Sequence, residues 1–202
     1  MSDLPTPLRD PEAMLQQALA DWGGHDDLWV FGYGSLIWRP DFEFAERRPA
    51  RVHGWHRALK MWSRINRGTP ERPGLVFGLL TGGCCRGVVF RVARDAAADT
   101  LTRLWSREMT LAVYDPRWLV AQTPEGPVRA LAFTLSRQSP SHTGELTEDH
   151  YRRIFAEATG IYGTTHDYAH RTLEELRRHD IRDRNLERLL KLIQRSAPDA
   201  PG

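Results

Sequence analysis

Two parts of the sequence combine residue types that could do chemistry. The first is the run Gly32-Tyr33-Gly34-Ser35-Leu36-Ile37, which follows an apolar stretch at residues 28–31. Glycines allow a tight turn and close backbone approach, so successive N–H groups could converge on a carboxylate or a developing oxyanion. Ile37 replaces the third glycine of a dinucleotide-binding fingerprint, and Ser35 lacks the flanking glycines of a hydrolase nucleophile elbow. The structural alternative is a tight turn in which Tyr33 packs.

Glu108 is the second candidate. Four residues at helical spacing share one face of a predicted helix: Leu101, Leu104, Trp105 and Glu108. The carboxylate therefore points toward an apolar surface, where acidic side chains are seldom buried without a partner. Glu108 either pairs with a neighbour such as Arg107, or it acts as a base whose pKa is raised by an apolar pocket. Periodicity alone favours the pairing.

Histidine and cysteine patterns argue against a metal site or a redox motif. His166 and His170 could share a helix face, but the sequence offers no third ligand, and we interpret them as surface or half-buried side chains. Cys84 and Cys85 are adjacent, which strains a disulfide between them, and the sequence has no Cys-x-x-Cys pattern. We expect two reduced thiols, mostly buried in a strand.

The composition is typical of a globular protein, with 202 residues of which 41% are hydrophobic and 27% are charged. The 28 Lys and Arg nearly balance the 26 Asp and Glu, so no strong preference for nucleic acid or an anionic membrane is expected. The sequence has neither an apolar run long enough to span a membrane nor a basic-then-apolar secretion signal. We therefore expect a cytoplasmic protein.

The hydrophobic periodicity predicts a strand-rich first two-thirds with one inserted helix, followed by a helical last third. Strands are predicted at residues 28–31, 52–63, 75–80, 86–92, 117–122 and 128–135. The pair Gly82-Gly83 separates the third strand from the fourth, and Pro124-Glu125-Gly126 is predicted to form a hairpin turn. Helices are predicted at residues 10–22, 95–109, 147–158, 165–178 and 186–193.

This segregation of strands and helices favours an α+β fold over a doubly wound parallel sheet. Residues 1–9 carry two prolines and are expected to form a loose arm. The expected organisation is an N-terminal arm and helix at residues 1–27, a single domain at residues 28–196 and a frayed tail at residues 197–202.

The run Val30-Phe31-Gly32-Tyr33-Gly34-Ser35-Leu36-Ile37-Trp38 resembles the signature opening of the ChaC-type γ-glutamylcyclotransferases, which are specific for glutathione. Further segments agree in order: Gly54-Trp55-His56-Arg57, Pro73-Gly74, Gly87 to Val92, Trp105-Ser106-Arg107-Glu108-Met109 and Gly163 to Tyr168. The resemblance covers roughly residues 28–193. It implies a compact mixed fold, in which a small closed or nearly closed β-sheet is surrounded by helices.

The resemblance also implies a reaction. The α-amine of a γ-glutamyl residue attacks its own γ-carbonyl, so glutathione yields 5-oxo-L-proline and L-cysteinylglycine without consuming water. Glu108 corresponds to the family's acid/base, and the backbone of Gly32–Ile37, with the Ser35 hydroxyl, would hold the glutamyl carboxylate and the γ-carbonyl oxygen. Tyr33 corresponds to a family tyrosine beside the pocket, and Tyr168 to one that faces the substrate. The implied reaction needs no metal and no nucleotide cofactor.

Other functions stay open at this point. A cyclotransferase for other γ-glutamyl amines or dipeptides would share the turn and the base but differ in its leaving-group pocket. A non-catalytic regulator associated with cation transport would need neither. A basic residue is also expected at the pocket to bind the glycine carboxylate of glutathione, and the sequence does not choose among Arg39, Arg57 and Arg107.

Overall fold

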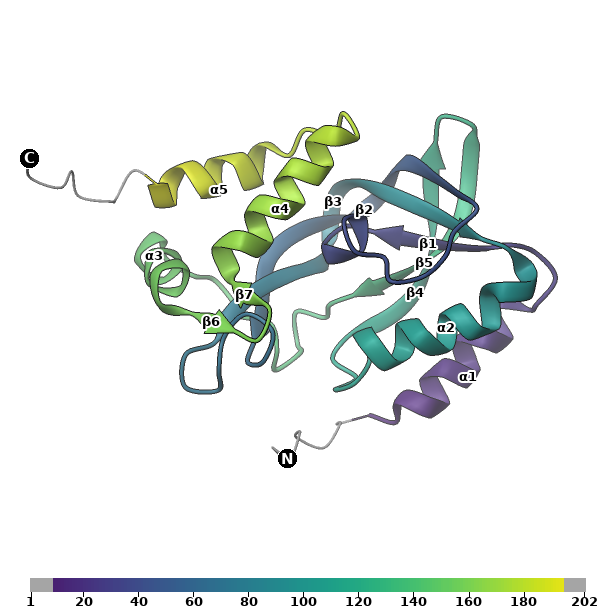
Figure 1. Cartoon of the computed structure of the whole chain (residues 1–202), viewed down its shortest axis with the longest axis horizontal. Helices are drawn as coiled ribbons and strands as arrows, with labels where there is room; N and C mark the ends of the chain where they lie inside the picture. The colour runs from purple at the N-terminus through teal and green to yellow at the C-terminus, as the bar shows by residue number, and fades with distance from the viewer. Residues whose placement is uncertain (1–8, 195–202) are drawn as a thin grey trace, which may run out of the picture. The chain divides into compact units, whose positions relative to one another are not determined.

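The computed structural model describes residues 9–194, which form two compact units (Figure 1). The first unit comprises the described chain up to Arg57 together with Leu79–Ser139. The second comprises Ala58–Gly78 together with the described chain from Pro140 onward. Residues 1–8 of the expected arm and the expected tail at residues 197–202 lie outside the described residues.

Five strands close a barrel in the order β1-β3-β2-β4-β5. In chain order they are β1 (Leu28–Gly32), β2 (Glu46–Ser63), β3 (Gly74–Val92), β4 (Asp115–Thr123) and β5 (Gly126–Thr134). Strand β1 runs antiparallel to β3 and parallel to β5, so the sheet is mixed. The predicted α+β fold, a small β-barrel with surrounding helices, is confirmed.

The hairpin between β4 and β5 has the predicted turn. Thr123 pairs with Gly126 across Pro124-Glu125, and Gly126 has a φ of +115°. A residue with a side chain rarely adopts that φ, so glycine is needed where the chain reverses. The Thr123 hydroxyl donates to the Gly126 carbonyl oxygen at 2.7 Å and closes the turn.

Strand β3 corrects the prediction of two strands separated by Gly82-Gly83. The strand is continuous from Gly74 to Val92, although these glycines have φ values of +100° and +75°. Glycine pairs of this kind also occur at bulges, which bend a strand without ending it. Strand β2 likewise begins at Glu46 rather than at residue 52, because its charged opening residues hide the strand pattern in the sequence.

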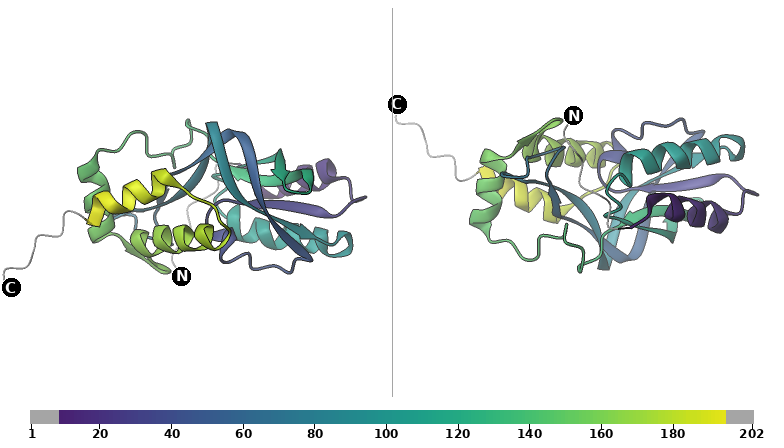
Figure 2. Two further views of the ribbon diagram at one scale, coloured as in Figure 1. Left: turned by 90° about the horizontal axis from the view of Figure 1, so that it is seen from above. Right: turned by 90° about the horizontal axis from the view of Figure 1, so that it is seen from below.

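Two helices of the first unit pack side by side (Figure 1), and Figure 2 shows the same elements from above and from below. They are α1 (Pro11–Trp22) and α2 (Arg94–Glu108), and both were predicted. Asp10 caps α1 by accepting from the Glu12 amide at 2.9 Å, a common way for a helix to begin. The Trp105 indole of α2 donates to the Pro11 carbonyl oxygen at 2.8 Å, which fixes one helix against the other.

Arg9 corrects the expectation of a loose arm through residue 9. Its guanidinium donates to the carbonyl oxygens of Ala112 and Tyr114, at 2.5 Å in each case, and pairs with the Asp115 carboxylate. These acceptors lie in the segment that follows α2. The chain is therefore anchored from Arg9 onward.

The core of the first unit joins the barrel wall to α2. The Trp105 ring packs edge-on against Phe133 of β5, with 5.6 Å between ring centroids. Large side chains that are almost completely buried fill the same core: Leu28, Phe31, Phe90, Leu101, Leu104 and Leu131. Burial of such side chains is the main stabilising contribution to a domain of this size. Helix α2 is thus held against the barrel by its apolar face.

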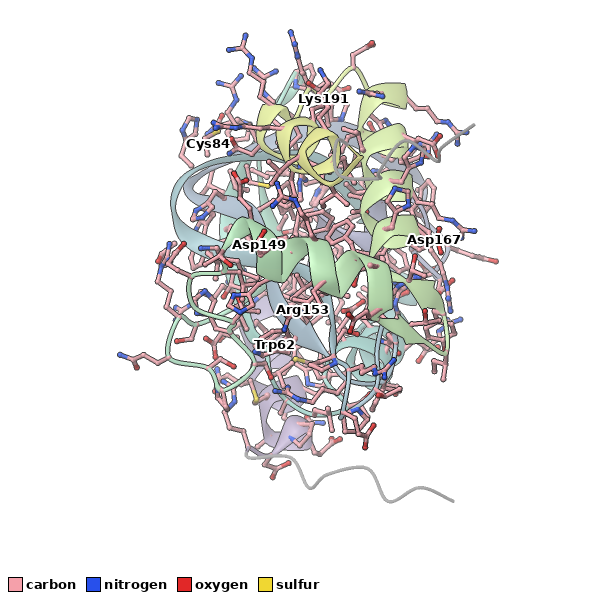
Figure 3. The ribbon with its side chains drawn as sticks, turned by 90° about the vertical axis from the view of Figure 1, so that its left-hand side faces the viewer. Trp62, Cys84, Asp149, Arg153, Asp167 and Lys191 are labelled. Atoms are coloured by element: carbon pink, nitrogen blue, oxygen red, sulfur yellow. The ribbon has the colours of Figure 1, made fainter. Side chains whose placement is uncertain are left out.

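The second unit contains three helices and a short two-stranded sheet. These elements are α3 (Glu148–Glu157), β6 (Thr159–Gly160), β7 (Gly163–Thr164), α4 (Thr165–Arg178) and α5 (Arg184–Gln194). Figure 3 labels one residue on each of these helices: Asp149 on α3, Asp167 on α4 and Lys191 on α5. Thr164 and Asp167 form a reciprocal capping box at the start of α4, which explains why the predicted and observed starts agree.

Candidate active site

The glycine-containing run forms a turn that leads out of β1. Ser35–Ile37 make one turn of 3-10 helix, in which the Ile37 amide donates to the Gly34 carbonyl oxygen at 3.1 Å. The Arg39 amide donates back to the Ser35 carbonyl oxygen at 2.8 Å. Both the tight turn and its position after an apolar strand were predicted, whereas the helical turn was not.

Close packing explains two of the glycines. A Cβ atom on Gly32 would lie 3.2 Å from the Phe90 ring and 3.3 Å from the Leu36 Cβ atom. A Cβ atom on Gly87 of β3 would lie 2.3 Å from the Gly32 carbonyl oxygen, well inside van der Waals contact. Strands β1 and β3 can approach this closely only because neither residue has a side chain.

The turn presents backbone donors. Among the described residues, the amides of Gly34, Ser35 and Leu36 donate no hydrogen bond to the rest of the chain. The Ile37 amide is already used inside the turn. Buried backbone N–H groups are nearly always paired in folded proteins, so consecutive unpaired amides mark a place where a ligand oxygen can bind.

Tyr33 is tied to the barrel at both its side chain and its backbone. Its hydroxyl donates to the Phe133 carbonyl oxygen at 2.7 Å in a buried position. Its own carbonyl oxygen accepts from Arg57 at 2.8 Å, and Arg57 also donates to the Arg86 carbonyl oxygen at 3.1 Å. The packing role considered for Tyr33 is therefore present, and Arg57 supports the turn from the barrel wall.

Glu108 is the last residue of α2, and its side chain is 16% exposed. Its Oε1 atom lies 3.0 Å from the Arg107 Nε atom. Burial raises the pKa of the Glu108 carboxyl, the Arg107 guanidinium lowers it, and the Asp41 carboxylate raises it further, so the pKa lies above its ordinary value. The negative end of the helix dipole acts on the carboxylate in the same direction as burial.

Arg107 brings the two candidate features together. The same guanidinium that pairs with Glu108 donates from Nη2 to the Ser35 hydroxyl oxygen at 3.1 Å. Residues 35 and 107 are 72 positions apart in the chain, and only the packing of α2 against the barrel brings them into contact. The predicted turn and the predicted carboxylate thus form one cluster in the first unit.

Asp41 is part of this cluster, and sequence reasoning did not find it. Its carboxylate accepts from Arg107 Nη1 at 2.9 Å and from Arg39 Nε at 2.8 Å. It has a φ of +58°, a conformation that Asp tolerates better than most residues. The preceding Pro40 is a turn signal, but nothing in the local sequence indicates that Asp41 meets α2.

Tyr168 lies in the second unit, on α4, and is buried. Its hydroxyl oxygen accepts from the Phe77 amide at 3.3 Å, and its ring lies 5.2 Å from the Phe77 ring. The Arg67 guanidinium stacks over the same ring at 5.1 Å. The suggestion that Tyr168 faces the substrate stays a prediction, since the cluster around Glu108 belongs to the other unit.

The remaining sequence candidates are distributed as follows. His166 and His170 share one face of α4 as predicted, with their rings stacked at 5.9 Å. Within residues 9–194, no group of three His, Cys, Asp or Glu side chains could hold a metal ion.

Cys84 and Cys85 are free thiols, but only Cys85 is buried, which corrects the expectation for Cys84. Adjacent residues of a strand face opposite sides of the sheet, so one of the two is exposed.

None of the helices in the described part of the chain combines the length and the apolar character needed to cross a membrane.

The fold is similar to that of a solved γ-glutamyl cyclotransferase. A crystal structure of a yeast γ-glutamyl cyclotransferase specific to glutathione superposes with a TM-score of 0.75 at 20% identity, covering 85% of this chain and 97% of that one. A family model described as ChaC-like protein matches residues 28–196. The chain belongs to this ChaC-like family.

Relatives of established name agree with that assignment. The glutathione-specific γ-glutamylcyclotransferase of Escherichia coli strain K12 is 33% identical over 192 residues, which cover 93% of this chain and 83% of the relative. The human glutathione-specific γ-glutamylcyclotransferase 1 is 32% identical over 151 residues, or 72% of this chain and 68% of the relative. Helix α1 precedes the residues that the family model matches.

Proposed function

We propose that this protein is a glutathione-specific γ-glutamylcyclotransferase, which cleaves glutathione to 5-oxo-L-proline and L-cysteinylglycine. The observation that carries the proposal is the cluster in which a half-buried carboxylate, Glu108, is joined through one guanidinium to the Ser35 hydroxyl beside unpaired backbone amides. The names of the Escherichia coli and human relatives support glutathione as the substrate.

Glu108 is the proposed acid/base. The α-ammonium of the γ-glutamyl group is not a nucleophile until it loses a proton, which the Glu108 carboxylate accepts. The freed amine attacks the γ-carbonyl carbon and closes a five-membered lactam. As the bond to the cysteine nitrogen breaks, the same carboxyl group returns the proton to the leaving amine, and the second proton lost by the ring nitrogen also ends on that amine, which leaves as an ammonium group. The reaction is an internal transfer, so no water is consumed.

The turn is the proposed binding site for the glutamyl group. Negative charge develops on the γ-carbonyl oxygen during attack, and the amides of Gly34, Ser35 and Leu36 are donors suited to that charge or to the glutamyl α-carboxylate. Because nucleophile and electrophile belong to one molecule, the main task of the turn is to hold the glutamyl chain in its attack geometry. Gly32, Tyr33 and Ile37 shape the turn, and Tyr168 is proposed as a further substrate contact.

The proposed partner is a small molecule alone. The reaction uses neither a metal nor a nucleotide, and the nearly balanced charge gives no reason to propose a nucleic acid partner. We also propose a cytoplasmic location, which the two free thiols favour because reduced cysteines are typical of that compartment.

A substrate comparison tests the proposal. The protein is incubated with glutathione and, separately, with γ-glutamylalanine, and the released 5-oxoproline is measured. We expect release from glutathione and much less from γ-glutamylalanine. Release from γ-glutamylalanine alone would assign the protein to cyclotransferases for other γ-glutamyl compounds. Release from neither would leave the regulator of cation transport as the better description.

A further inference from the structure

The Arg107 guanidinium contacts three different side chains. Its Nε atom lies 3.0 Å from Glu108 Oε1, its Nη2 atom lies 3.1 Å from Ser35 Oγ, and its Nη1 atom lies 2.9 Å from Asp41 Oδ2. All three nitrogens are therefore used, and each contacts a different side chain. A single planar group connects the candidate base, the candidate substrate turn and a second acid.

Two backbone acceptors hold the same guanidinium in place. Nη1 also donates to the carbonyl oxygen of Arg39 at 2.5 Å and to that of Pro40 at 3.2 Å. The segment that follows the turn thus wraps the arginine head group. Charge-assisted hydrogen bonds in a fixed fork restrict the plane of the guanidinium, so its position is defined from several directions.

We propose that Arg107 is a positioning residue, which fixes the Glu108 carboxylate at a set place relative to Ser35 and is itself held by Asp41. This inference rests on the proposed cyclotransferase function. It excludes Arg107 from the role considered for it in the sequence, that of binding the glycine carboxylate of the substrate, because its nitrogens already bind protein groups.

The electrostatics of the cluster give Arg107 a second effect. A base must be ionised before it can accept a proton, and burial works against this by raising the pKa of the Glu108 carboxyl. The positive charge of Arg107 lowers the pKa of Glu108 and so opposes the effect of burial. The negative charge of Asp41, on the segment after the turn, raises this pKa as burial does. Arg39 also pairs with Asp41, through the same carboxylate oxygen, Oδ2, that contacts Arg107. Removing Arg107 and removing Asp41 should therefore shift the ionisation of Glu108 in opposite directions.

A merely structural role is the alternative. Basic residues in the last turn of a helix are common because they interact favourably with the helix dipole, and Arg107 occupies that place in α2. A structural arginine would change stability, and with it the amount of active enzyme, at every pH alike. It would not change the pH at which activity appears.

The test compares pH profiles of 5-oxoproline release from glutathione for the wild type and four variants of the full chain. Arg107→Met removes the charge and the fork, Arg107→Lys keeps the charge, and Asp41→Asn removes the competing acid. Arg103→Met is the matched control, because Arg103 is an exposed arginine one turn earlier on α2 and donates to a carbonyl oxygen of its own helix.

We expect Arg107→Met to lower kcat at neutral pH by about tenfold or more, with a smaller change in KM, and to move the acidic limb of the profile to higher pH. In Arg107→Lys, the acidic limb of the pH profile should lie closer to its wild-type position because the charge is kept. Its kcat should stay below that of the wild type because the fork of donors is lost. Asp41→Asn should move the limb to lower pH, and Arg103→Met should match the wild type.

An Arg107→Met variant that keeps the wild-type profile, or loses the same factor at every pH, would overturn the inference. A titration of the Glu108 side-chain carboxyl by ¹³C NMR, assigned with Glu108→Gln, reports the same shift without relying on turnover. A wild type that releases no 5-oxoproline contradicts the proposed function. An Arg107→Met titration that does not move contradicts the inference.

Discussion

Two clusters of the first unit pair glutamate with arginine, yet they move the pKa of the glutamate in opposite directions. On the barrel wall, Glu46 accepts from Arg48 and from Arg91, and hydrogen bonds from these two guanidinium groups lower its pKa from 4.5 to about 2. At the end of α2, Glu108 has one arginine, and the pKa of its carboxyl is raised.

Burial and the supply of positive charge account for the difference. The Glu46 side chain is 28% exposed and has two arginines, one of which also binds Asp27 at 2.6 Å. The Glu108 side chain is 16% exposed, and Asp41 shares its single arginine. A carboxylate that is surrounded by positive charge stays ionised and serves as a structural group, whereas a buried carboxylate with a shared arginine has a raised pKa, as is common for groups that exchange protons. Environment, and not residue type, distinguishes the two clusters.

The largest expected effect is a difference in kcat between variants of the two glutamates. Glu108→Gln should lower kcat for 5-oxoproline release by roughly 10²–10⁴-fold, the usual contribution of a general acid/base. Glu46→Gln is the matched control, and its kcat should equal that of the wild type. Equal losses in the two variants, measured on folded protein, would show that the clusters do not differ in role.

A smaller effect is expected inside the cluster around Glu108. Ser35→Ala removes the hydroxyl that accepts from Arg107 and, in the proposed function, also contacts the substrate. A hydrogen bond to a charged group contributes about 1.5 kcal/mol, so kcat/KM should fall by about tenfold. Ser106→Ala is the control, because the exposed Ser106 hydroxyl bonds only a carbonyl of its own helix. Steady-state kinetics that place both variants at the wild-type value would remove Ser35 from the site.

The smallest expected effect is on stability and depends on pH. Because folding lowers the pKa of Glu46, its contribution to the free energy of unfolding is present above pH 4.5 and is lost as the pH falls toward about 2. Glu46→Gln should therefore lower the Tm by no more than a few degrees at pH 7, and the difference should vanish near pH 2.

The contribution of Glu108 to the free energy of unfolding depends on pH in the opposite direction. Because folding raises its pKa, its favourable contribution is present below pH 4.5 and is lost as the pH rises through the folded value. The Tm of Glu108→Gln at pH 7 should equal that of the wild type or lie slightly above it. Scanning calorimetry at several pH values checks both signs, and parallel curves for Glu46→Gln and Glu108→Gln would contradict the comparison.

Local patterns were sufficient to predict the local structure around the candidate site residues. An apolar strand followed by glycines predicted the turn after β1, and helical spacing placed Glu108 on the buried face at the end of α2. The two interpretations of Glu108 proved compatible, since it pairs with Arg107 and is also buried enough to raise its pKa. In the structure, Asp10 caps α1 and Thr164 caps α4 at or next to the predicted starts of these helices.

Contacts between distant segments were not predictable from these patterns. The bonds from Arg107 to Ser35 and to Asp41 span 72 and 66 residues, and no local spacing encodes them. Strand β3 is likewise continuous through Gly82 and Gly83, although the glycine pair is locally a signal for a strand end. Local sequence patterns therefore located the turn and Glu108, while tertiary packing determined which side chains they contact.

The most direct test of the proposed function asks whether oxygen from water enters the products. Glutathione is turned over by the wild type in water enriched in ¹⁸O, and the products are analysed by mass spectrometry. Internal attack by the α-amine predicts 5-oxoproline and cysteinylglycine in equal amounts, with no ¹⁸O in either at early times. Glutamate carrying ¹⁸O in its γ-carboxylate would mean that water is the nucleophile, and it would contradict the role proposed for Glu108 and the turn.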